Sequence, residues 1–180
     1  RMLELNNYIL RTKKLQHPIY VIQEHHASHL HWDLRLEIDD VLVSWAIPKG
    51  PSTNPADKRL AVQTEDHPMD YATFEGIIPQ GQYGAGVVMV WDIGTYKNTE
   101  KKDYQLVPIE KCLKNGHIDI FIEGEKLKGG YSLIRLRSSD KNWLFIKRND
   151  EYANTPKDPI KTERKSAITD RTIEEIKKAG

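Results

Sequence analysis

The sequence predicts an all-β protein, a small barrel or sandwich, on the basis of three observations. Between residues 19 and 148, short runs rich in β-branched and aromatic residues alternate with Gly, Pro, Asp and Asn, which is typical of antiparallel strands joined by turns. The intervals between the runs leave little room for crossover helices, which argues against a parallel α/β sheet. With 180 residues, 38% of them hydrophobic, the chain can bury one core and is short for two.

Eight runs are expected to be strands, and two pairs of them are expected to be hairpins. Asp39 and Asp40 separate the second run from the third by a tight turn, and polar residues 138–142 join the last two runs. The eight runs cover residues 19–24, 31–38, 41–47, 59–65, 87–92, 117–123, 131–137 and 143–148.

Helical patterns are confined to the periphery, at residues 6–15, 108–114 and 171–179, where Asp170 is the expected N-cap. Residues 149–169 are polar and contain Pro156 and Pro159, which predicts an extended arm that either packs on the β domain or stays mobile. We therefore expect an N-terminal arm or helix over 1–18, a β domain over 19–148, and a C-terminal arm with a short helix over 149–180.

Composition excludes several classes of protein. The 27 Lys and Arg against 26 Asp and Glu leave a net charge of +1, so any polyanion site must come from local clustering. The single Cys112 excludes an internal disulfide and a thiolate zinc cluster. No apolar run approaches the roughly 20 residues of a membrane span, and residues 1–14 lack a signal-peptide core. These features predict a soluble, cytoplasmic and monomeric protein.

The most informative stretch is residues 25–37, which holds four of the seven histidines. On a strand beginning at His31, alternation places polar side chains on one face and apolar ones on the other. A 3d metal binds imidazole and carboxylate ligands, so His31 and Asp33 predict a metal site completed by either His25 or His29. Spacing alone is equally compatible with metal-free histidines. The polar row comprises His31, Asp33, Arg35 and Glu37.

A second strand is expected to gather polar groups in the same way and to complete a polar pocket. Arg35 and Arg59 can bind phosphate oxygens through their guanidinium groups, Lys49 can add a point charge, and His67 and Tyr71 can supply protons or hydrogen bonds. Solvated charges, or an ion pair of Arg35 with a neighbouring carboxylate, are the simpler alternatives. The row expected on this face is Arg59, Ala61, Gln63, Glu65 and His67.

Two other sets of residues are expected to be structural. The glycines of residues 79–86 could cradle a phosphate, but they precede a strand rather than a helix, which favours a tight turn or bulge. The four tryptophans lie within strand patterns and are expected in the core. They are Trp32, Trp45, Trp91 and Trp143.

These residues resemble a known family, the 3′-phosphoesterase domain of bacterial DNA ligase D and its stand-alone archaeal and bacterial relatives. The resemblance extends in order and spacing over about residues 19–148. It implies a compact, curved antiparallel β-barrel of about eight strands with short peripheral helices. The matching blocks are residues 23–37, 44–51, 59–62, 65–71, 74–79, 81–86 and 91–95.

The resemblance also implies a role for each site residue. It assigns the metal ligands to His25, His31 and Asp33, which favours His25 over His29. The family's usual metal is Mn²⁺, and Co²⁺ or Zn²⁺ could occupy the same ligands. The implied catalytic and phosphate-handling residues are Arg35, His67 and Tyr71, and the implied supporting residues are Gln23, Lys49, Arg59 and Glu65.

The activity implied by the resemblance is healing of 3′ ends in non-homologous end joining. A diesterase step removes a terminal ribonucleoside, and a monoesterase step removes the remaining 3′-phosphate to leave a 3′-OH. Family members use acidic residues of an Arg-Asp-Phe segment and a Glu-Pro for the diesterase step, whereas this chain has Arg-Thr-Lys-Lys-Leu at 11–15 and His17-Pro18. The ribonuclease step is therefore less strongly expected than the phosphatase step.

The sequence also leads to expected binding partners and to two alternative functions. The implied partners are DNA or RNA/DNA 3′ ends and a separate DNA ligase and polymerase, since the chain could be a stand-alone enzyme or a domain of a longer protein. One alternative is a cupin-like iron dioxygenase, because His29 and His31 followed by Glu37 resemble that ligand pattern. The other is a non-catalytic module that binds DNA ends.

Overall fold

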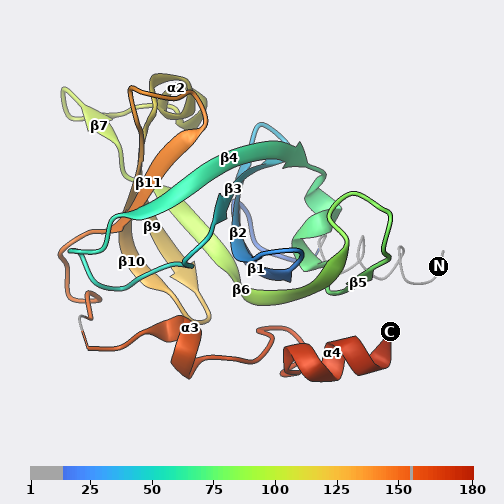
Figure 1. Cartoon of the computed structure of the whole chain (residues 1–180). Helices are drawn as coiled ribbons and strands as arrows, with labels where there is room; N and C mark the ends of the chain where they lie inside the picture. Colours follow the sequence, from blue (N-terminus) through green and yellow to red (C-terminus); the bar gives the residue numbers. More distant parts are fainter. Residues whose placement is uncertain (1–13, 155) are drawn as a thin grey trace.

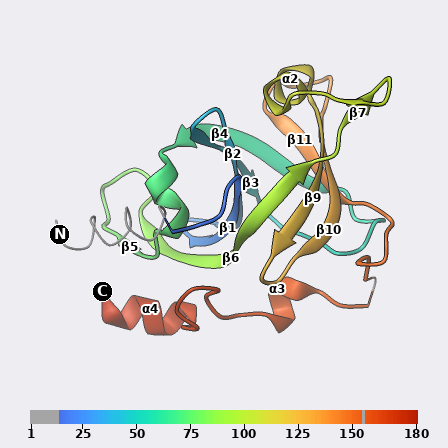
Figure 2. The same cartoon turned by 180° about the vertical axis from the view of Figure 1, so that it is seen from behind.

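The computed structural model describes residues 14–154 and 156–180 and shows a closed antiparallel β-barrel (Figures 1 and 2). Eight strands close the barrel in the order β1-β2-β3-β4-β11-β10-β9-β6, with β6 pairing back to β1, and β5 adds to β6. The strands are β1 (Ile19–His26), β2 (Leu30–Ile38), β3 (Val41–Ile47), β4 (Arg59–His67), β5 (Gly76–Ile78), β6 (Gly86–Asn98), β9 (His117–Gly124), β10 (Lys128–Arg135) and β11 (Asn142–Lys147).

The predicted fold class and strand count are confirmed. Every predicted run overlaps one of the eight barrel strands, and the helix expected over 6–15 lies outside the described residues except for its last two positions. Strand β6 extends past the predicted residue 92 because it serves two parts of the sheet. It pairs with β1 and β5 along its first half and with β9 along its second. Strand β5 and the small hairpin of β7 (Lys101–Lys102) and β8 (Gln105–Leu106) were not predicted.

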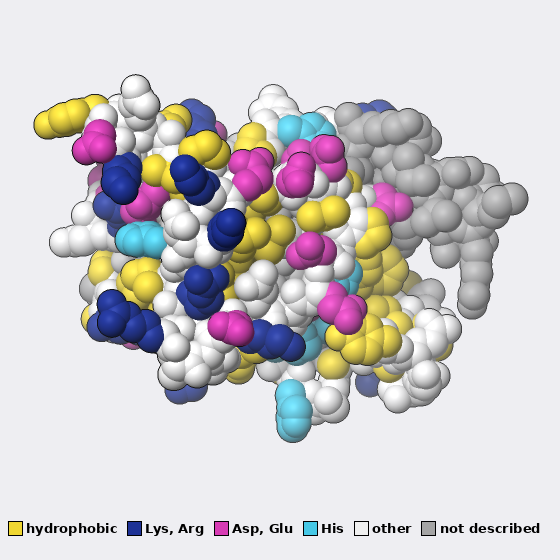
Figure 3. Space-filling view, turned by 90° about the horizontal axis from the view of Figure 1, so that it is seen from above, with side chains coloured by type: hydrophobic (Ala, Val, Ile, Leu, Met, Phe, Trp, Pro, Cys, Tyr) yellow, Lys and Arg dark blue, Asp and Glu magenta, His cyan; other side chains and the backbone are white. Residues whose placement is uncertain are grey.

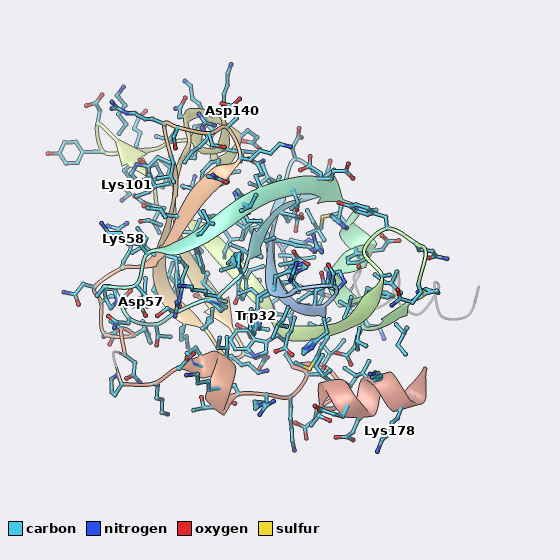
Figure 4. All side chains as sticks on the ribbon, viewed as in Figure 1. Trp32, Asp57, Lys58, Lys101, Asp140 and Lys178 are labelled. Carbon is cyan, nitrogen blue, oxygen red and sulfur yellow. The ribbon has the colours of Figure 1, made fainter. Side chains whose placement is uncertain are left out.

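The barrel interior holds the apolar face of every strand. The four tryptophans belong to this core as predicted, with Trp45, Trp91 and Trp143 fully buried and Trp32 6% exposed. Trp32 lies at the lower rim, near the short helix α3 (Pro159–Thr162) (Figure 4), and a Cβ atom at Gly50 would lie only 3.1 Å from its ring. Because side chains alternate along a strand, the opposite face of β1 to β4 is left for other groups.

The β2–β3 hairpin turns through Asp39 and Asp40 as predicted. Both residues adopt positive φ, 52° and 65°, which is the backbone of a two-residue type I′ turn. Asp tolerates this region better than most residues. The turn fixes the β2–β3 register, in which Arg35 lies opposite Ser44 and Asp33 opposite Ala46.

Within residues 14–154 and 156–180, four short helices lie outside the barrel: η1 (Met69–Thr73), α2 (Ile109–Asn115), α3 (Pro159–Thr162) and α4 (Ile173–Ala179). The helices predicted at 108–114 and 171–179 are confirmed, but the Asp170 cap is wrong. Thr172 caps α4 through a capping box, in which its hydroxyl accepts from the Glu175 N–H and the Glu175 carboxylate accepts from the Thr172 N–H. Asp170 instead has a φ of 58° in the preceding turn.

The C-terminal arm packs on the barrel, which decides between the two predicted alternatives. It runs beneath the barrel in Figure 1 and includes α3, which the sequence analysis did not expect. The Trp91 indole N–H donates to the carbonyl of Glu163, and the Ala167 N–H donates to the carbonyl of Val90. Ile176 of α4 is 2% exposed within the main core. None of the helices described is both long enough and apolar enough to cross a membrane.

Candidate active site

A cleft of about 380 Å³ lies against the non-core face of β1 to β4. Its lining comes from strands β1 to β4, from η1, from Ile78 of β5 and from the loop before β6. The lining residues whose side chains can bind a metal or an anion, or exchange a proton, are His25, His31, Asp33, Arg35, His67 and Tyr71.

Three of these side chains converge as a metal-ligand group. The Asp33 Oδ2 lies 3.2 Å from His31 Nε2 and 3.5 Å from His25 Nδ1. One ligand atom from each residue lies within 4.8 Å of the others. Ligands about 2.1 Å from a shared metal lie roughly 3.0–3.5 Å apart, so these spacings fit a transition metal. β1 and β2 create the group, because His25 and His31 are directly opposite in their antiparallel register.

Backbone carbonyls orient both imidazoles for this role. The Nε2 of His25 lies 2.8 Å from the carbonyl of Gly84, and the Nδ1 of His31 lies 3.1 Å from the carbonyl of His29. A carbonyl only accepts, so each contact places a ring proton on the outer nitrogen, and the inner nitrogen, which contacts Asp33, is the one that would bind a metal. Metal-ligating histidines are held in this way by a second layer of contacts.

The electrostatics of the cleft keep Asp33 ionised. Burial alone would raise the pKa of its carboxyl, but hydrogen bonds from His25 and His31 and the charge of Arg35 outweigh burial and hold that pKa well below its usual value. For His31, burial acts to lower the pKa, and the hydrogen bond with Asp33 raises it overall. Asp33 is thus an anionic ligand at every pH at which the protein would work.

Arg35 is the buried cation of the site, with 3% exposure. Its Nε donates to Gln23 Oε1 at 2.6 Å, and its NH1 donates to Ser44 Oγ at 2.8 Å. Its NH2 lies 3.5 Å from Asp33 Oδ2, and the guanidinium lies over the Tyr71 ring, 5.0 Å from the centroid. A guanidinium fixed on several sides is a preorganised anion ligand.

His67 and Tyr71 lie beside Arg35. His67 Nδ1 is 3.1 Å from Arg35 NH1 and 3.0 Å from the carbonyl of Glu65, which leaves Nε2 for a substrate. Burial, with the charge of Arg35 second, lowers the pKa of His67, so the ring is neutral near pH 7. Burial also raises the pKa of Tyr71, which keeps its hydroxyl protonated.

The comparison with protein families identifies the chain. Residues 23–135 match the family model described as the DNA ligase D 3′-phosphoesterase domain. The chain belongs to this family. Its curated relatives include proteins named multifunctional non-homologous end joining protein LigD from Pseudomonas aeruginosa, 46% identical over 158 residues, and from Mycolicibacterium smegmatis, 47% identical over 139 residues. A third, from Mycobacterium tuberculosis, is 48% identical over 125 residues.

These matches cover much of this chain and little of the relatives. They span 86%, 77% and 69% of this chain but 18%, 18% and 15% of the respective relatives. The chain therefore corresponds to less than a fifth of each LigD protein. The membership confirms the family resemblance seen in the sequence.

Within this LigD domain, the structure brings together seven of the ten predicted site residues. Gln23 is fully buried behind Arg35, and its amide also donates to the carbonyls of Tyr71 and Phe74, which ties η1 to β1. The other three, Lys49, Arg59 and Glu65, do not line the cleft. Their supporting roles stay predictions.

The prediction that the β4 residues Arg59, Ala61, Gln63 and Glu65 face the pocket together with His67 is wrong. Ser44 pairs with Thr64 and Leu42 with His67, so β4 has one extra residue in this interval, a β-bulge. A bulge inverts the alternation that follows it. Thr64 therefore faces the cleft with His67, and Gln63 points to the core, where it accepts from the Trp143 indole.

Sequence reasoning missed four other contributors to the site. Ser44 holds Arg35, Thr64 lines the cleft, Gly84 orients His25, and Tyr83 stands at the cleft with 84% exposure. The alternation of β3 could have revealed Ser44, since it shares a face with the residue opposite Asp33. The glycine-rich loop was correctly predicted to be a turn, with Gly81 and Gly84 at positive φ.

Proposed function

We propose that the chain is a metal-dependent 3′-phosphoesterase that removes a 3′-phosphate from a DNA end and leaves a 3′-OH. One observation carries the proposal: a three-ligand group and a buried guanidinium share one cleft and meet at the same Asp33 oxygen. A metal and an Arg side by side match the negative charge of a phosphate monoester. The family description and the names of the LigD relatives support this reaction and a role in end joining.

His25, His31 and Asp33 would hold the metal, Mn²⁺ by analogy with the family, and the same donors suit Co²⁺ or Zn²⁺. Such an ion, when bound, lowers the pKa of water and neutralises phosphate charge. The protein supplies the fixed geometry, because the carbonyls of Gly84 and His29 set the two imidazole tautomers before any substrate arrives.

Arg35 is proposed to bind the phosphate oxygens as charge develops on them. Gln23 and Ser44 take up its Nε and NH1 donors, so the NH2 beside Asp33 is the group left nearest to the metal ligands. A donor held in place before the reaction stabilises the transition state without reorganising. Gln23 and Ser44 therefore act as positioning residues.

His67 is proposed to lie at the leaving oxygen, which must gain a proton as its bond to phosphorus breaks. Its Nδ1 contacts both the Arg35 guanidinium, which only donates, and the Glu65 carbonyl, which only accepts, so Nε2 is the ring nitrogen left for the leaving oxygen. Its lowered pKa means that the ring meets this oxygen as a neutral group rather than as a cation. The Tyr71 ring lies 4.9 Å from the His67 ring and supports it, and its protonated hydroxyl adds a further donor in the cleft.

The proposed substrates are 3′ ends of DNA or RNA/DNA duplexes, prepared for a separate polymerase and ligase. Removal of a terminal 3′-ribonucleoside is proposed as a slower activity, because the acidic residues expected for that step are replaced at 11–15 and by His17-Pro18. Lys49 and Arg59, which lie outside the cleft, would contact phosphates farther along the substrate.

A labelled primer–template with a 3′-phosphate or a single 3′-ribonucleotide tests the proposal. With Mn²⁺ we expect phosphate release from the first substrate and slower trimming of the second, and a chelator should stop both. His25→Ala and Asp33→Ala should each lower phosphate release at least about 100-fold, since each removes a metal ligand. His29→Ala is the matched control and should retain activity, because its side chain is exposed and outside the cleft.

The two rival functions make different predictions. The dioxygenase would need Glu37 as a ligand, but its carboxylate bonds to His17 and to the Ile19 N–H instead. The binding module would retain end binding and show no turnover with any divalent metal. Tight binding without phosphate release would therefore contradict our proposal and favour the module.

A further inference from the structure

A second group of metal-ligating side chains lies outside the cleft. Among residues 14–154 and 156–180, Glu100, His117 and Asp119 form a group with one ligand atom each within 4.8 Å of the others. His117 and Asp119 lie on β9, and Glu100 lies between β6 and β7. Lys101, the residue after Glu100, is labelled in Figure 4 at the β7 end of the molecule, far from α4 and Lys178.

This group shares its spacing with the first one. His117 Nε2 lies 3.2 Å from Asp119 Oδ1 and 3.7 Å from Glu100 Oε2. The corresponding distances around Asp33 are 3.2 and 3.5 Å. In both groups a His and an Asp are two residues apart on one strand, with a buried residue between them, so alternation directs both side chains to the same face.

Neighbouring side chains and backbone groups also hold the residues of the second group in place. The Ser132 hydroxyl donates to Asp119 Oδ1 at 2.5 Å, and Arg148 NH1 lies 3.4 Å from Asp119 Oδ2. In the first group Arg35 NH2 lies 3.5 Å from Asp33 Oδ2, the oxygen that also faces the histidines. The backbone of Glu100 is fixed on both sides, because its N–H donates to Asn98 and its carbonyl accepts from Val107. Contacts behind the ligands are what distinguish a prepared site from a chance cluster.

Glu100 supplies the independent sign of a missing ligand. Its side chain is 21% exposed, but its Oε2 is excluded from solvent and has no hydrogen-bond partner among the described residues, and its contact with His117 Nε2, at 3.7 Å, is beyond hydrogen-bond distance. A buried carboxylate oxygen without a donor is unfavourable, and a cation would satisfy it. Glu100 and His117 also line a separate cleft of about 450 Å³, which offers open positions to water or an anion. Figure 3 shows Lys and Arg side chains gathered over this end of the molecule.

We propose that Glu100, His117 and Asp119 form a second site for a divalent transition metal. One imidazole nitrogen with two carboxylate oxygens suits Zn²⁺ or Mn²⁺ better than Mg²⁺, which prefers oxygen ligands alone. The alternative occupant of the same position is a proton on His117, which would pair with both carboxylates without a metal. The two differ in one measurable respect, since only the metal site binds Zn²⁺.

Calorimetric titration of the metal-free chain of residues 1–180 with Zn²⁺ at pH 7.5 tests the proposal. We expect two sites in the unchanged protein and one in Asp33→Asn, which disables the first group. In the Asp33→Asn background, His117→Ala should abolish the remaining site, and Ser132→Ala should weaken it about tenfold. His29→Ala in that background is the matched control and should leave it unchanged. Melting temperatures verify that each variant is folded.

Two results would overturn the second site. One is an Asp33→Asn protein that binds no Zn²⁺, and the other is equal Zn²⁺ binding by Asp33→Asn with and without His117→Ala. If His117→Ala disrupts the fold, Asp119→Asn, which keeps the shape of the side chain, serves in its place with the same expectation. The outcome is independent of the proposed phosphatase, because binding is measured, and His117→Ala alone should retain phosphate release.

Discussion

At the scale of single residues, the site is organised around the guanidinium of Arg35, which lines the cleft although the residue is only 3% exposed. Desolvating a guanidinium is unfavourable unless its donors are paired. In Arg35 the partners are side chains on three strands, namely Gln23 on β1, Asp33 on β2 and Ser44 on β3. The three strands thus fix one functional group, and a substrate phosphate would meet it already oriented.

Replacement of Arg35 by Lys tests the importance of this geometry. Lys keeps the charge but has a single nitrogen, so it cannot contact Gln23, Ser44 and a phosphate together. We expect phosphate release from 3′-phosphate DNA to fall on the order of 100-fold, a loss of about 3 kcal/mol in transition-state stabilisation. Arg137→Lys, at an exposed position outside the cleft, is the matched control and should stay within about twofold. A fully active Arg35→Lys protein would refute the proposed role.

Asp92 is a second buried charge, with a consequence for stability rather than catalysis. Burial raises the pKa of its carboxyl to about 6, although the hydroxyl of Tyr20 and the N–H groups of Lys126 and Leu127 donate to it and oppose the shift. Between pH 4 and 6 the folded chain therefore keeps a proton that the unfolded chain has released. By linkage, this group makes stability fall as pH rises through that window.

The expected size of this effect is about 3 kcal/mol, because a shift of roughly two pKa units corresponds to that energy. Urea unfolding of the unchanged protein and of Asp92→Asn at several pH values measures it. The Asn side chain does not titrate. The free energy of unfolding of the unchanged protein minus that of Asp92→Asn should therefore fall from pH 4 to pH 7. A difference that stays constant or widens would show that the Asp92 carboxyl is not raised.

At the scale of elements, alternation predicted the strands and the ligand row of β2 but failed on β4. An apolar–polar pattern reports which face is buried only while the strand stays regular. The extra residue of β4 lies between the positions that pair with Ser44 and Leu42 of β3. It is a property of the pairing of two strands, and the sequence of one strand does not contain it. The assignment of His25 over His29 similarly needed the family resemblance, because it depends on the cross-strand register with His31.

The loop before β6 has a role that its glycines alone did not predict. Gly84 anchors it to His25, and Tyr83 presents an exposed ring at the cleft beside that anchor. We predict that Tyr83 stacks on the terminal nucleotide. Tyr83→Ala should raise KM for 3′-phosphate DNA about tenfold with kcat nearly unchanged, since stacking is worth roughly 1–3 kcal/mol per base.

Tyr104→Ala is the matched control for this loop, because Tyr104 is 99% exposed on the turn between β7 and β8 and lies outside the cleft. It should change neither constant. A fall in kcat at constant KM in Tyr83→Ala would instead assign the loop to the chemical step through its contact with the metal ligand His25.

At the scale of the whole molecule, the barrel and the C-terminal arm form one packed unit. Strand β6 closes the barrel against β1, and the arm crosses β6 to insert α4 against the core (Figure 2). The side chain of Arg171 adds an ion pair to the buried Glu75, with 3.0 Å between Arg171 NH2 and Glu75 Oε2. The arm therefore braces β6, the strand that pairs with β1 and so supports the strand that carries His25.

Two Ile→Ala variants measure how much the arm contributes. Ile176 on α4 is 2% exposed within the core, whereas Ile134 on β10 is 36% exposed. Removing a buried Ile leaves a cavity, so Ile176→Ala should lower the free energy of unfolding by about 2–4 kcal/mol. Ile134→Ala should lose about 1 kcal/mol or less, because its side chain is already partly solvated. Equal losses in denaturant unfolding would mean that α4 can detach without disturbing the barrel core, and that the arm is not part of the cooperative unit.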